Sequence, residues 1–238
     1  MKPLTFRKLT ADELEARVST VTAKGCSVLI YKNARVDMAV LDETVGQMNW
    51  QRNHREEKGN LFCGIGIKDT DTGEWVWKWD CGSESYTEKE KGEASDSFKR
   101  AGFNWGIGRE LYTCPFIWFR AGDVNIEEYN GKRTTRDHFD VKEIEYEGNK
   151  VSYLVVENTK TKKQFSWGMP AQAKANLSPD DMKRAQLKKL LMETNSDIGL
   201  FLTWCGREFK HEVKAVDVLE GHELDRAIAK VNQKGQNK

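Results

Sequence analysis

The chain has 238 residues, of which 38% are hydrophobic and 32% are charged, and it carries 38 Lys and Arg against 37 Asp and Glu. Its length fits one large domain or one domain with a small appendage, and its apolar content is enough for a buried core. The net charge of +1 excludes a protein held to nucleic acid by its overall charge, so a polyanion site would need cations that are gathered locally.

Composition and motifs exclude several other classes of protein. The cysteines are odd in number, widely spaced and without a CxxC pair, which is typical of reduced thiols and not of a disulfide frame or a zinc site: Cys26, Cys63, Cys81, Cys114 and Cys205. No apolar run reaches the roughly 18 residues of a membrane span, and the first residues lack the apolar core of a signal peptide. P-loop, GxSxG and HExxH motifs are absent from the sequence. We therefore expect an intracellular protein that is not an enzyme and has no cofactor, metal or membrane partner.

The first expected elements are a helix, a strand and a second helix. Thr10-Ala-Asp-Glu13 is a capping box and predicts a short helix over residues 11–18. The β-branched and aromatic run 26–33 predicts a strand. The second helix is expected over residues 34–46, because it has an apolar stripe and a glycine at its end: Val36, Val40, Leu41, Val45 and Gly46.

Between residues 48 and 82 the pattern changes to a period of two. The segments 48–56, 60–68 and 74–82 predict three consecutive antiparallel strands, and the turn Asp69–Gly73 joins the last two. In the third strand, one face is aromatic: Trp75, Trp77, Trp79 and Cys81. This stripe is either the core beneath the helix that follows or a platform on which bases or sugars stack.

We expect the tryptophan stripe to be core, because the next helix is amphipathic and needs a surface to pack on. That helix is predicted from about Glu88 to Trp105, opening at Thr87, with an apolar stripe of Ala94, Phe98, Ala101 and Trp105. The opposite face of the three strands would then be exposed and would line a groove with Arg52, Lys68 and Lys78.

Several cations stand at positions that favour contact with phosphates. Arg35 lies at the start of a predicted helix, where the helix dipole disfavours a cation, so it is either a solvent-exposed arginine or a functional one. Lys99 and Arg100 are adjacent in the long helix, and Arg109 follows it. The same long helix is also typical of a solvated amphipathic helix packed on a sheet, so these residues alone do not decide between the two interpretations.

The second half of the chain predicts more strands and then helices. An extended segment follows Tyr112, residues 130–137 form a basic exposed loop, and the stretch from 138 to 168 predicts an antiparallel meander. A boundary is expected near residue 169. Beyond it, Ser178-Pro179 opens a helix and two shorter helices follow, which makes a small helical module that either docks a partner or caps the main domain. The expected fold class is α+β, with domains over residues 1–168 and 169–238.

Residues 32–112 resemble the Rad fifty-two family of single-strand annealing proteins, including the Sak-type recombinases of bacteriophages. The resemblance lies in NARVDMAVLDETVGQMNW, in the hairpin GIGIKDTDTGEWVWKWDCG and in EKEKGEASDSFKRAGFNWGIG. It covers about a third of the chain and is strongest in the last segment. It implies an antiparallel β-β-β-α core within residues 10–112, packed on the long helix, with residues 113–168 as extra strands.

The resemblance also implies which residues contact DNA. Members of that family assemble into a ring or a helical filament and hold single-stranded DNA in a basic groove with its bases outward. Arg35, Lys99 and Arg100 match the groove contacts, and Lys91 matches a further basic position. Lys68 lies near a family position tied to a second DNA site, although the turn here differs in length. Phe103 stands where some members keep a cation, so Arg52, Lys78 or Arg109 would supply part of the charge.

The function implied is the ATP-independent annealing of complementary single strands in homologous recombination, by a homo-oligomer in the cytoplasm of a bacterial host. The expected partners are single-stranded DNA, other copies of the chain and, through the C-terminal helices, a phage exonuclease or a host single-stranded DNA-binding protein. Two alternatives stay open: a protein that binds and protects single-stranded nucleic acid and recruits partners without annealing, and an interaction scaffold whose tryptophan face is only core.

Overall fold

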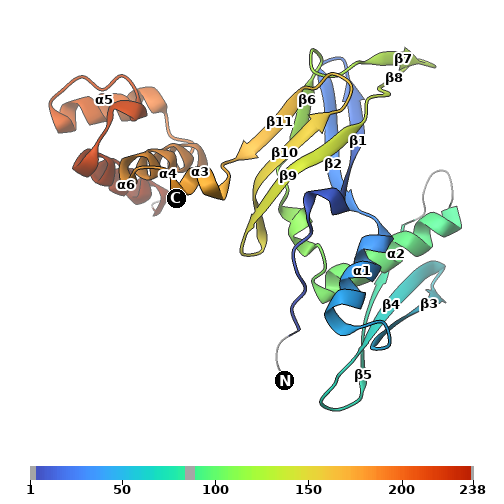
Figure 1. Cartoon of the computed structure of the whole chain (residues 1–238). Helices are drawn as coiled ribbons and strands as arrows, with labels where there is room; N and C mark the ends of the chain where they lie inside the picture. Colours follow the sequence, from blue (N-terminus) through green and yellow to red (C-terminus); the bar gives the residue numbers. More distant parts are fainter. Residues whose placement is uncertain (1–3, 84–88, 237–238) are drawn as a thin grey trace. The chain divides into compact units, whose positions relative to one another are not determined.

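The computed structural model describes residues 4–83 and 89–236 (Figure 1). The chain has an α+β fold and divides into two compact units, Met1–Gly168 and Met169–Lys238. This division coincides with the boundary expected near residue 169. The first unit has two main parts, each built on an antiparallel sheet, and they share one hydrophobic core.

A six-stranded antiparallel sheet forms one part of the first unit, in the order β11-β10-β9-β1-β2-β6. Its strands are β1 Leu14–Thr22, β2 Gly25–Lys32, β6 Ile117–Arg120, β9 Phe139–Glu147, β10 Lys150–Asn158 and β11 Gln164–Gly168. The expected strand over 26–33 and the expected meander are therefore confirmed. The meander joins the N-terminal hairpin through β1 and β9, so residues 113–168 complete this sheet and are not a separate addition.

The helix expected over residues 11–18 is wrong. The capping box between Thr10 and Glu13 does form, but it closes a single 3-10 turn, Ala11–Glu13, and the chain continues as β1. Leu14, Ala16 and Val18 alternate with exposed residues and face the core. This period of two is that of a strand, which is stabilised by pairing with β2. Tertiary pairing thus overrides the local helix signal.

The second part of the first unit is the expected β-β-β-α arrangement. The strands β3 Trp50–Glu57, β4 Asn60–Lys68 and β5 Trp75–Cys81 form an antiparallel sheet. The helices α1 Ala34–Val45 and α2 Lys89–Trp105 lie on one side of it (Figure 1). Both helix predictions are confirmed, including Gly46 as the C-cap of α1, but the expected opening at Thr87 and Glu88 lies outside the described residues.

The expectation that α2 covers the tryptophan stripe is wrong. α2 packs on the opposite face, where Cys63, Ile65 and Ile67 of β4 are buried against Phe98 and Ala101. Lys78 and Asp80 of β5 face α2 as well, since they bond Asn104 and Arg100. In Figure 1 no element from the described part of the first unit lies on the outer side of this sheet. The expected groove-lining face is therefore the packed one, and the aromatic face is the open one.

Two short elements complete the first unit. The 3-10 turn Arg109–Thr113 leads from α2 into β6. The basic loop expected over residues 130–137 is instead partly a two-stranded ribbon, β7 Glu127–Tyr129 with β8 Lys132–Thr134. Asn130 and Gly131 form its turn with φ of 49° and 71°, a conformation that favours these two residue types.

The second unit is a bundle of helices: α3 Ala171–Ala175, α4 Pro179–Glu193, α5 Ile198–Phe209 and α6 Gly221–Gln236, with the 3-10 turn Val216–Val218. Ser178 caps α4 by accepting a hydrogen bond from the backbone of Asp181, as the Ser-Pro pair predicts. This unit has its own hydrophobic core, which includes Leu187, Phe201, Leu219 and Leu224. No helix in the described part of the chain is both long and apolar enough to cross a membrane.

Candidate nucleic-acid interface

Arg35 and Lys99 are brought together by the packing of α1, α2 and the β1–β2 hairpin. Arg35 is exposed on the first turn of α1, where Asn33 caps the helix by accepting a hydrogen bond from the Arg35 backbone at 2.9 Å. Lys99 lies in the middle of α2 with 23% of its side chain exposed. The pKa of Glu15 lies below its usual value because Tyr31 and Asn33 hydrogen-bond its carboxylate, and the charges of Lys99 and Arg35 lower it further. Two cations that are 64 positions apart in the sequence therefore act on one carboxylate.

The outer face of the β1–β2 hairpin extends this basic surface with aromatic groups. The guanidinium of Arg17 lies 5.4 Å from the ring centre of Tyr31, a cation–π contact. Both residues line a pocket of about 330 Å³ with Leu29 and Tyr112. Tyr112 is 69% exposed, and its ring lies 4.9 Å from that of Phe103 on α2. Arg35 and Lys99 do not line this pocket, and we use the name basic groove for the surface that contains both the pocket and these two cations: Arg17, Tyr31, Arg35, Lys99 and Tyr112.

Arg100 shares only part of this position. Its Nε lies 3.3 Å from the carboxylate of Asp80 on β5, and 42% of its side chain is exposed. Lys99 and Arg100 are adjacent in α2 and so project about 100° apart around the helix. Both cations have a carboxylate partner, since the ammonium of Lys99 lies 3.8 Å from Asp96. Lys99 belongs to the groove because it acts on Glu15, whereas Arg100 bridges α2 to the three-stranded sheet.

The structure does not bring the other predicted cations to the groove. Lys78 donates to the carbonyl of Asn104 at 3.0 Å, and its ammonium lies 4.3 Å from the ring of Trp105. Arg109 donates to the carbonyls of Phe103 and Asn104 at 2.8 and 2.9 Å. Both cations thus satisfy carbonyls at the C-terminal end of α2, which is a structural role.

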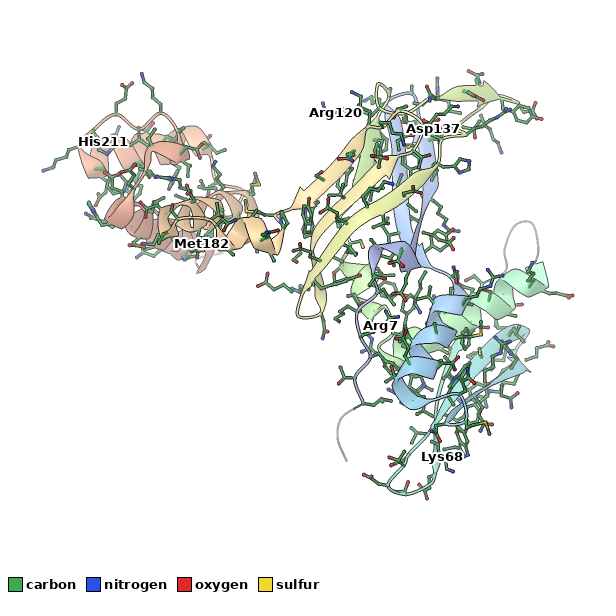
Figure 2. All side chains as sticks on the ribbon, viewed as in Figure 1. Arg7, Lys68, Arg120, Asp137, Met182 and His211 are labelled. Atoms are coloured by element: carbon green, nitrogen blue, oxygen red, sulfur yellow. The ribbon has the colours of Figure 1, made fainter. Side chains whose placement is uncertain are left out.

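The remaining predicted cations lie on other surfaces. Arg52 of β3 lies on the side of the sheet that α2 covers, with its guanidinium 5.3 Å from the ring of Phe98. Lys91 is exposed near the start of α2. Lys68 is exposed at the end of β4, and Figure 2 shows it at the tip of the three-stranded sheet. Of the predicted residues, Arg35 and Lys99 are the two that contribute to the basic groove as defined above.

Three residues of the groove were missed by the sequence reasoning: Arg17, Tyr31 and Tyr112. Arg17 was placed in a helix, and the alternation in residues 14–18 was the signal that would have put Glu15 and Arg17 on one face of a strand. Tyr31 was correctly placed in a strand, but its exposure depends on how that strand pairs. Tyr112 lies in a 3-10 turn whose direction no local pattern gives.

A buried ion pair fixes the helices behind the groove. Lys32 at the end of β2 and Asp37 of α1 pair with side chains only 1% and 0% exposed, and Lys32 also lies 3.4 Å from the carbonyl of Lys99. Gly102 of α2 makes room for the pair, because a Cβ at this position would collide with the Asp37 carboxylate. Burial raises the pKa of Asp37 to about 6, an effect that Lys32 opposes. The pair holds α1 against α2 and so sets the positions of Arg35 and Lys99.

The described residues show no metal-ligand cluster, and their buried thiols are inert. They contain no group of three His, Cys, Asp or Glu side chains that could hold a metal ion. Burial raises the pKa of the Cys26, Cys63, Cys114 and Cys205 thiols to about 11, which keeps them protonated and unreactive. The features that gather at the groove are cations and aromatic rings, which suit binding to a polyanion with stacked bases.

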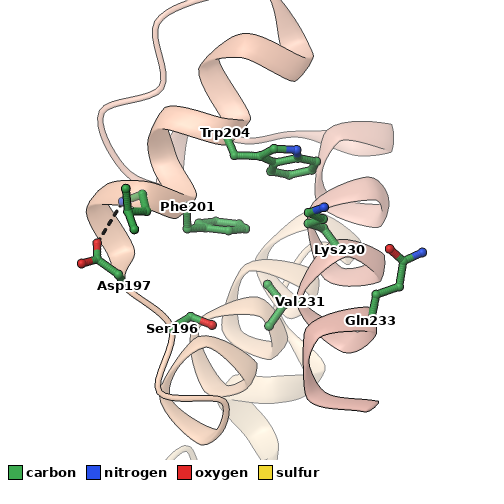
Figure 3. Close-up of a pocket in the computed structure, with 8 residues that line it drawn as sticks. Ser196, Asp197, Phe201, Trp204, Lys230, Val231 and Gln233 are labelled. Atoms are coloured by element: carbon green, nitrogen blue, oxygen red, sulfur yellow. Dashed lines mark hydrogen bonds between the residues drawn. The ribbon is translucent and has the colours of Figure 1, made fainter. Parts of the chain in front are cut away.

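The second unit has a pocket of its own, of about 440 Å³ (Figure 3). Phe201 and Trp204 of α5 form its aromatic side, with ring centres 6.0 Å apart, and Lys230 and Val231 of α6 face them. Asp197 lies at its edge, but its carboxylate is engaged in capping α5 through the backbone of Leu200 at 2.9 Å. Lys230 thus contributes a cation beside an aromatic pocket, its ammonium 5.6 Å from the Trp204 ring.

Comparisons with known proteins give no further guide. No model of a known family matches the chain, no curated protein matches it, and no solved structure matches it.

Proposed function

We propose that the protein binds single-stranded DNA and anneals complementary strands without ATP, as an oligomeric ring or filament in homologous recombination. The observation that carries the proposal is the convergence of Arg35 and Lys99 at Glu15, beside Arg17 and the exposed ring of Tyr112. Cations that track phosphates next to aromatic rings are the usual design of single-strand binding sites. The resemblance of residues 32–112 to the Rad fifty-two family points to the same function.

The charge of the chain fits a repeated site better than a single one. With a net charge of +1, one subunit would bind DNA weakly, because few counterions are released by two or three phosphate contacts. Repeating the basic groove around an assembly links these weak contacts along one strand and raises the overall affinity by multivalency. A strand held by its phosphates keeps its bases free to pair, and duplex stacking of about 1.4 kcal/mol per step then drives annealing. No bond is made or broken, so the proposed protein is not an enzyme and needs no cofactor.

A second candidate is a single-strand binding protein that recruits partners without annealing. The pocket between α5 and α6 favours it, because an aromatic cavity with a cation beside it suits an acidic or aromatic peptide segment. In either case we place the protein in the cytoplasm of a bacterial host, encoded by a phage or prophage. An exonuclease or the host single-stranded DNA-binding protein is the proposed partner of the second unit.

Mixing two complementary oligonucleotides with the protein, with no nucleotide added, tests the first candidate. The donor and acceptor dyes on the two strands should approach faster than in protein-free buffer. Arg35→Ala with Lys99→Ala should abolish the acceleration, and Lys188→Ala with Lys189→Ala, an adjacent exposed pair on α4, should keep it. Binding without acceleration would support the second candidate, and wild-type protein that does not bind either strand would overturn both.

A further inference from the structure

The outer face of the three-stranded sheet is an uncovered aromatic surface. We call it the tryptophan face: Phe62 of β4 with Trp75, Trp77 and Trp79 of β5. Trp77 and Trp79 lie flat on the sheet with ring centres 5.6 Å apart. Their cross-strand neighbours are Gly66 and Gly64, where a Cβ would come within 2.7 and 2.5 Å of the indoles. The glycines thus bring the rings onto the backbone of β4 and leave their other faces directed outward.

A contiguous aromatic face of this kind is typical of an interface in a soluble protein. Trp75 is 38% exposed, and Trp77 and Trp79 are covered only in part by each other and by Arg55, whose guanidinium lies 4.2 Å from the Trp79 ring. Tryptophan is also the residue that most often dominates the binding free energy of protein interfaces. We therefore expect another molecule to cover this face.

The charges around the tryptophan face argue against nucleic acid as that occupant. The β4–β5 end of the sheet is acidic, with Asp69, Asp71 and Glu74 against Lys68, whereas Arg55 and Lys58 balance Glu56 and Glu57 at the β3–β4 end. Arg55, the cation over the rings, also pairs with Glu57 at 3.4 Å. A phosphate backbone laid along these strands would meet net negative charge at the β4–β5 end, which opposes binding. The surroundings favour a protein surface with basic edges.

The same unit carries a second uncovered aromatic surface, and its edges are basic. We call it the Phe116 patch: Phe116, which directly precedes β6, Trp118 of β6, and Leu29 of β2, which also lines the pocket of the basic groove. Phe116 is 75% exposed, Leu29 is 47% exposed, and the rings of Phe116 and Trp118 stack at 6.0 Å. Lys24 and Arg120 border it, and both are exposed. Figure 2 shows Arg120 at the far end of β6, at the edge of the six-stranded sheet.

We propose that a second copy of this chain covers the tryptophan face with its Phe116 patch, in a head-to-tail contact that repeats from subunit to subunit. The two surfaces match in character, since both are aromatic at the centre, and their edges have opposite charge. A contact of the tryptophan face with itself would leave the acidic β4–β5 end without a basic edge to match it. Because the two surfaces differ, the contact is heterologous and generates a ring or an open filament instead of a closed dimer. This inference rests on the proposed assembly and assigns its surfaces.

The test is the assembly state of single and mixed variants, measured by mass photometry with and without a long oligonucleotide. Trp77→Glu breaks the tryptophan face, and Phe116→Glu breaks the opposite patch. Each alone should weaken self-association by at least about 30-fold, as expected for a buried interface aromatic. Mixed one to one, they should form a dimer, because the Phe116 patch of the first variant can still cover the intact tryptophan face of the second. Trp75→Glu repeats the first break at a more exposed position, and circular dichroism checks that each variant is folded.

The outcomes separate this inference from the proposed function. Variants that assemble like the wild type would overturn the interface while leaving the annealing function standing. Loss of assembly in Trp77→Glu but not in Phe116→Glu would replace the head-to-tail contact by a face-to-face one. Loss of DNA affinity with unchanged assembly in Trp77→Glu would make the face a base-stacking platform instead. A wild-type protein that stays a single subunit on DNA would overturn the proposed assembly itself, and with it this interface.

Discussion

Charged residues have two different roles at the junction of β2, α1 and α2, one on its inner side and one on its outer side. On the inner side Lys32 and Asp37 are almost completely buried and pair with each other. On the outer side Arg35 of α1 is exposed and Lys99 of α2 is half-buried, and both lie near Glu15. The inner charges pair with each other inside the fold, whereas the outer charges remain available to a ligand. A cation's position in the sequence does not say which group it belongs to, and the following predictions test that division.

The largest effect is expected inside the junction. Lys32→Ala leaves the buried Asp37 carboxylate without its counterion and should lower the free energy of unfolding by about 3–5 kcal/mol. The deficit should shrink at acidic pH, because burial raises the pKa of Asp37 and a protonated carboxyl carries no unpaired charge. Urea denaturation at two pH values measures both effects.

The matched variant removes both charges. Lys32→Met combined with Asp37→Leu should lose much less stability than Lys32→Ala, because no buried charge is left without a partner. If Lys32→Ala unfolds at the urea concentration of the wild type, then Lys32 is not the counterion that fixes this junction.

Outside the junction the expected effect is on DNA binding and not on stability. Arg35→Ala with Lys99→Ala should weaken binding of single-stranded DNA by about tenfold or more, about 1.4 kcal/mol. The slope of log affinity against log salt should fall by about 1.4, since each phosphate contact on a single strand contributes about 0.7. Fluorescence anisotropy titrations over a range of salt concentrations give both numbers.

Two matched pairs show whether position or charge alone matters. Lys188→Ala with Lys189→Ala removes equal charge from an exposed helix and should leave the salt slope unchanged. Lys99→Ala with Arg100→Ala should cost less affinity than the Arg35 pair, because Asp80 already neutralises part of the Arg100 charge. Equal losses in all three pairs would contradict the groove.

A smaller effect is expected from Arg109, which is exposed but engaged by the fold. Its two hydrogen bonds to the carbonyls of Phe103 and Asn104 end α2, so Arg109→Ala should lower the free energy of unfolding by about 1 kcal/mol. DNA affinity should stay at the wild-type value. If the variant lost DNA affinity while its free energy of unfolding stayed at the wild-type value, Arg109 would instead be a cation that contacts DNA.

The smallest effect is expected at the surface pair of Arg7 and Glu13. Arg7 bonds the Glu13 carboxylate at 2.7 Å and lowers its pKa from 4.5 to about 2. The stabilisation is therefore present above about pH 4.5 and is lost as pH falls toward 2. Glu13→Gln should cost no more than about 1 kcal/mol at neutral pH, because the pair is screened by solvent. The stability difference between the variant and the wild type should vanish on acidification, and a constant difference would assign the effect to packing.

Much of the secondary structure followed from local pattern. The period of two between residues 48 and 82 marked β3, β4 and β5, and the apolar stripes marked α1 and α2. Ser178 and Gly46 marked helix ends through the chemistry of their caps. These features depend on neighbours in sequence, and so the sequence carries them directly.

The faces of those elements were decided by packing. Both sides of the three-stranded sheet are apolar, and periodicity tells the two sides apart without saying which one α2 covers. The buried residues of β4, Cys63, Ile65 and Ile67, alternate with Gly64 and Gly66, and the glycines lie under the tryptophans. Residues 14–18 likewise form part of β1 because they hydrogen-bond to β2, although the capping box that precedes them predicts a helix.

Residue type and spacing determined that this chain holds amphipathic helices, alternating strands and a few cations in unusual places. Only the tertiary structure determined that Arg35 and Lys99 both act on Glu15, that Lys78 and Arg109 bond carbonyls at the end of α2, and that Lys32 is buried against Asp37. The physical reason is that a cation's role depends on the nearest carboxylates, carbonyls and rings, and these neighbours are supplied by elements far away in the sequence.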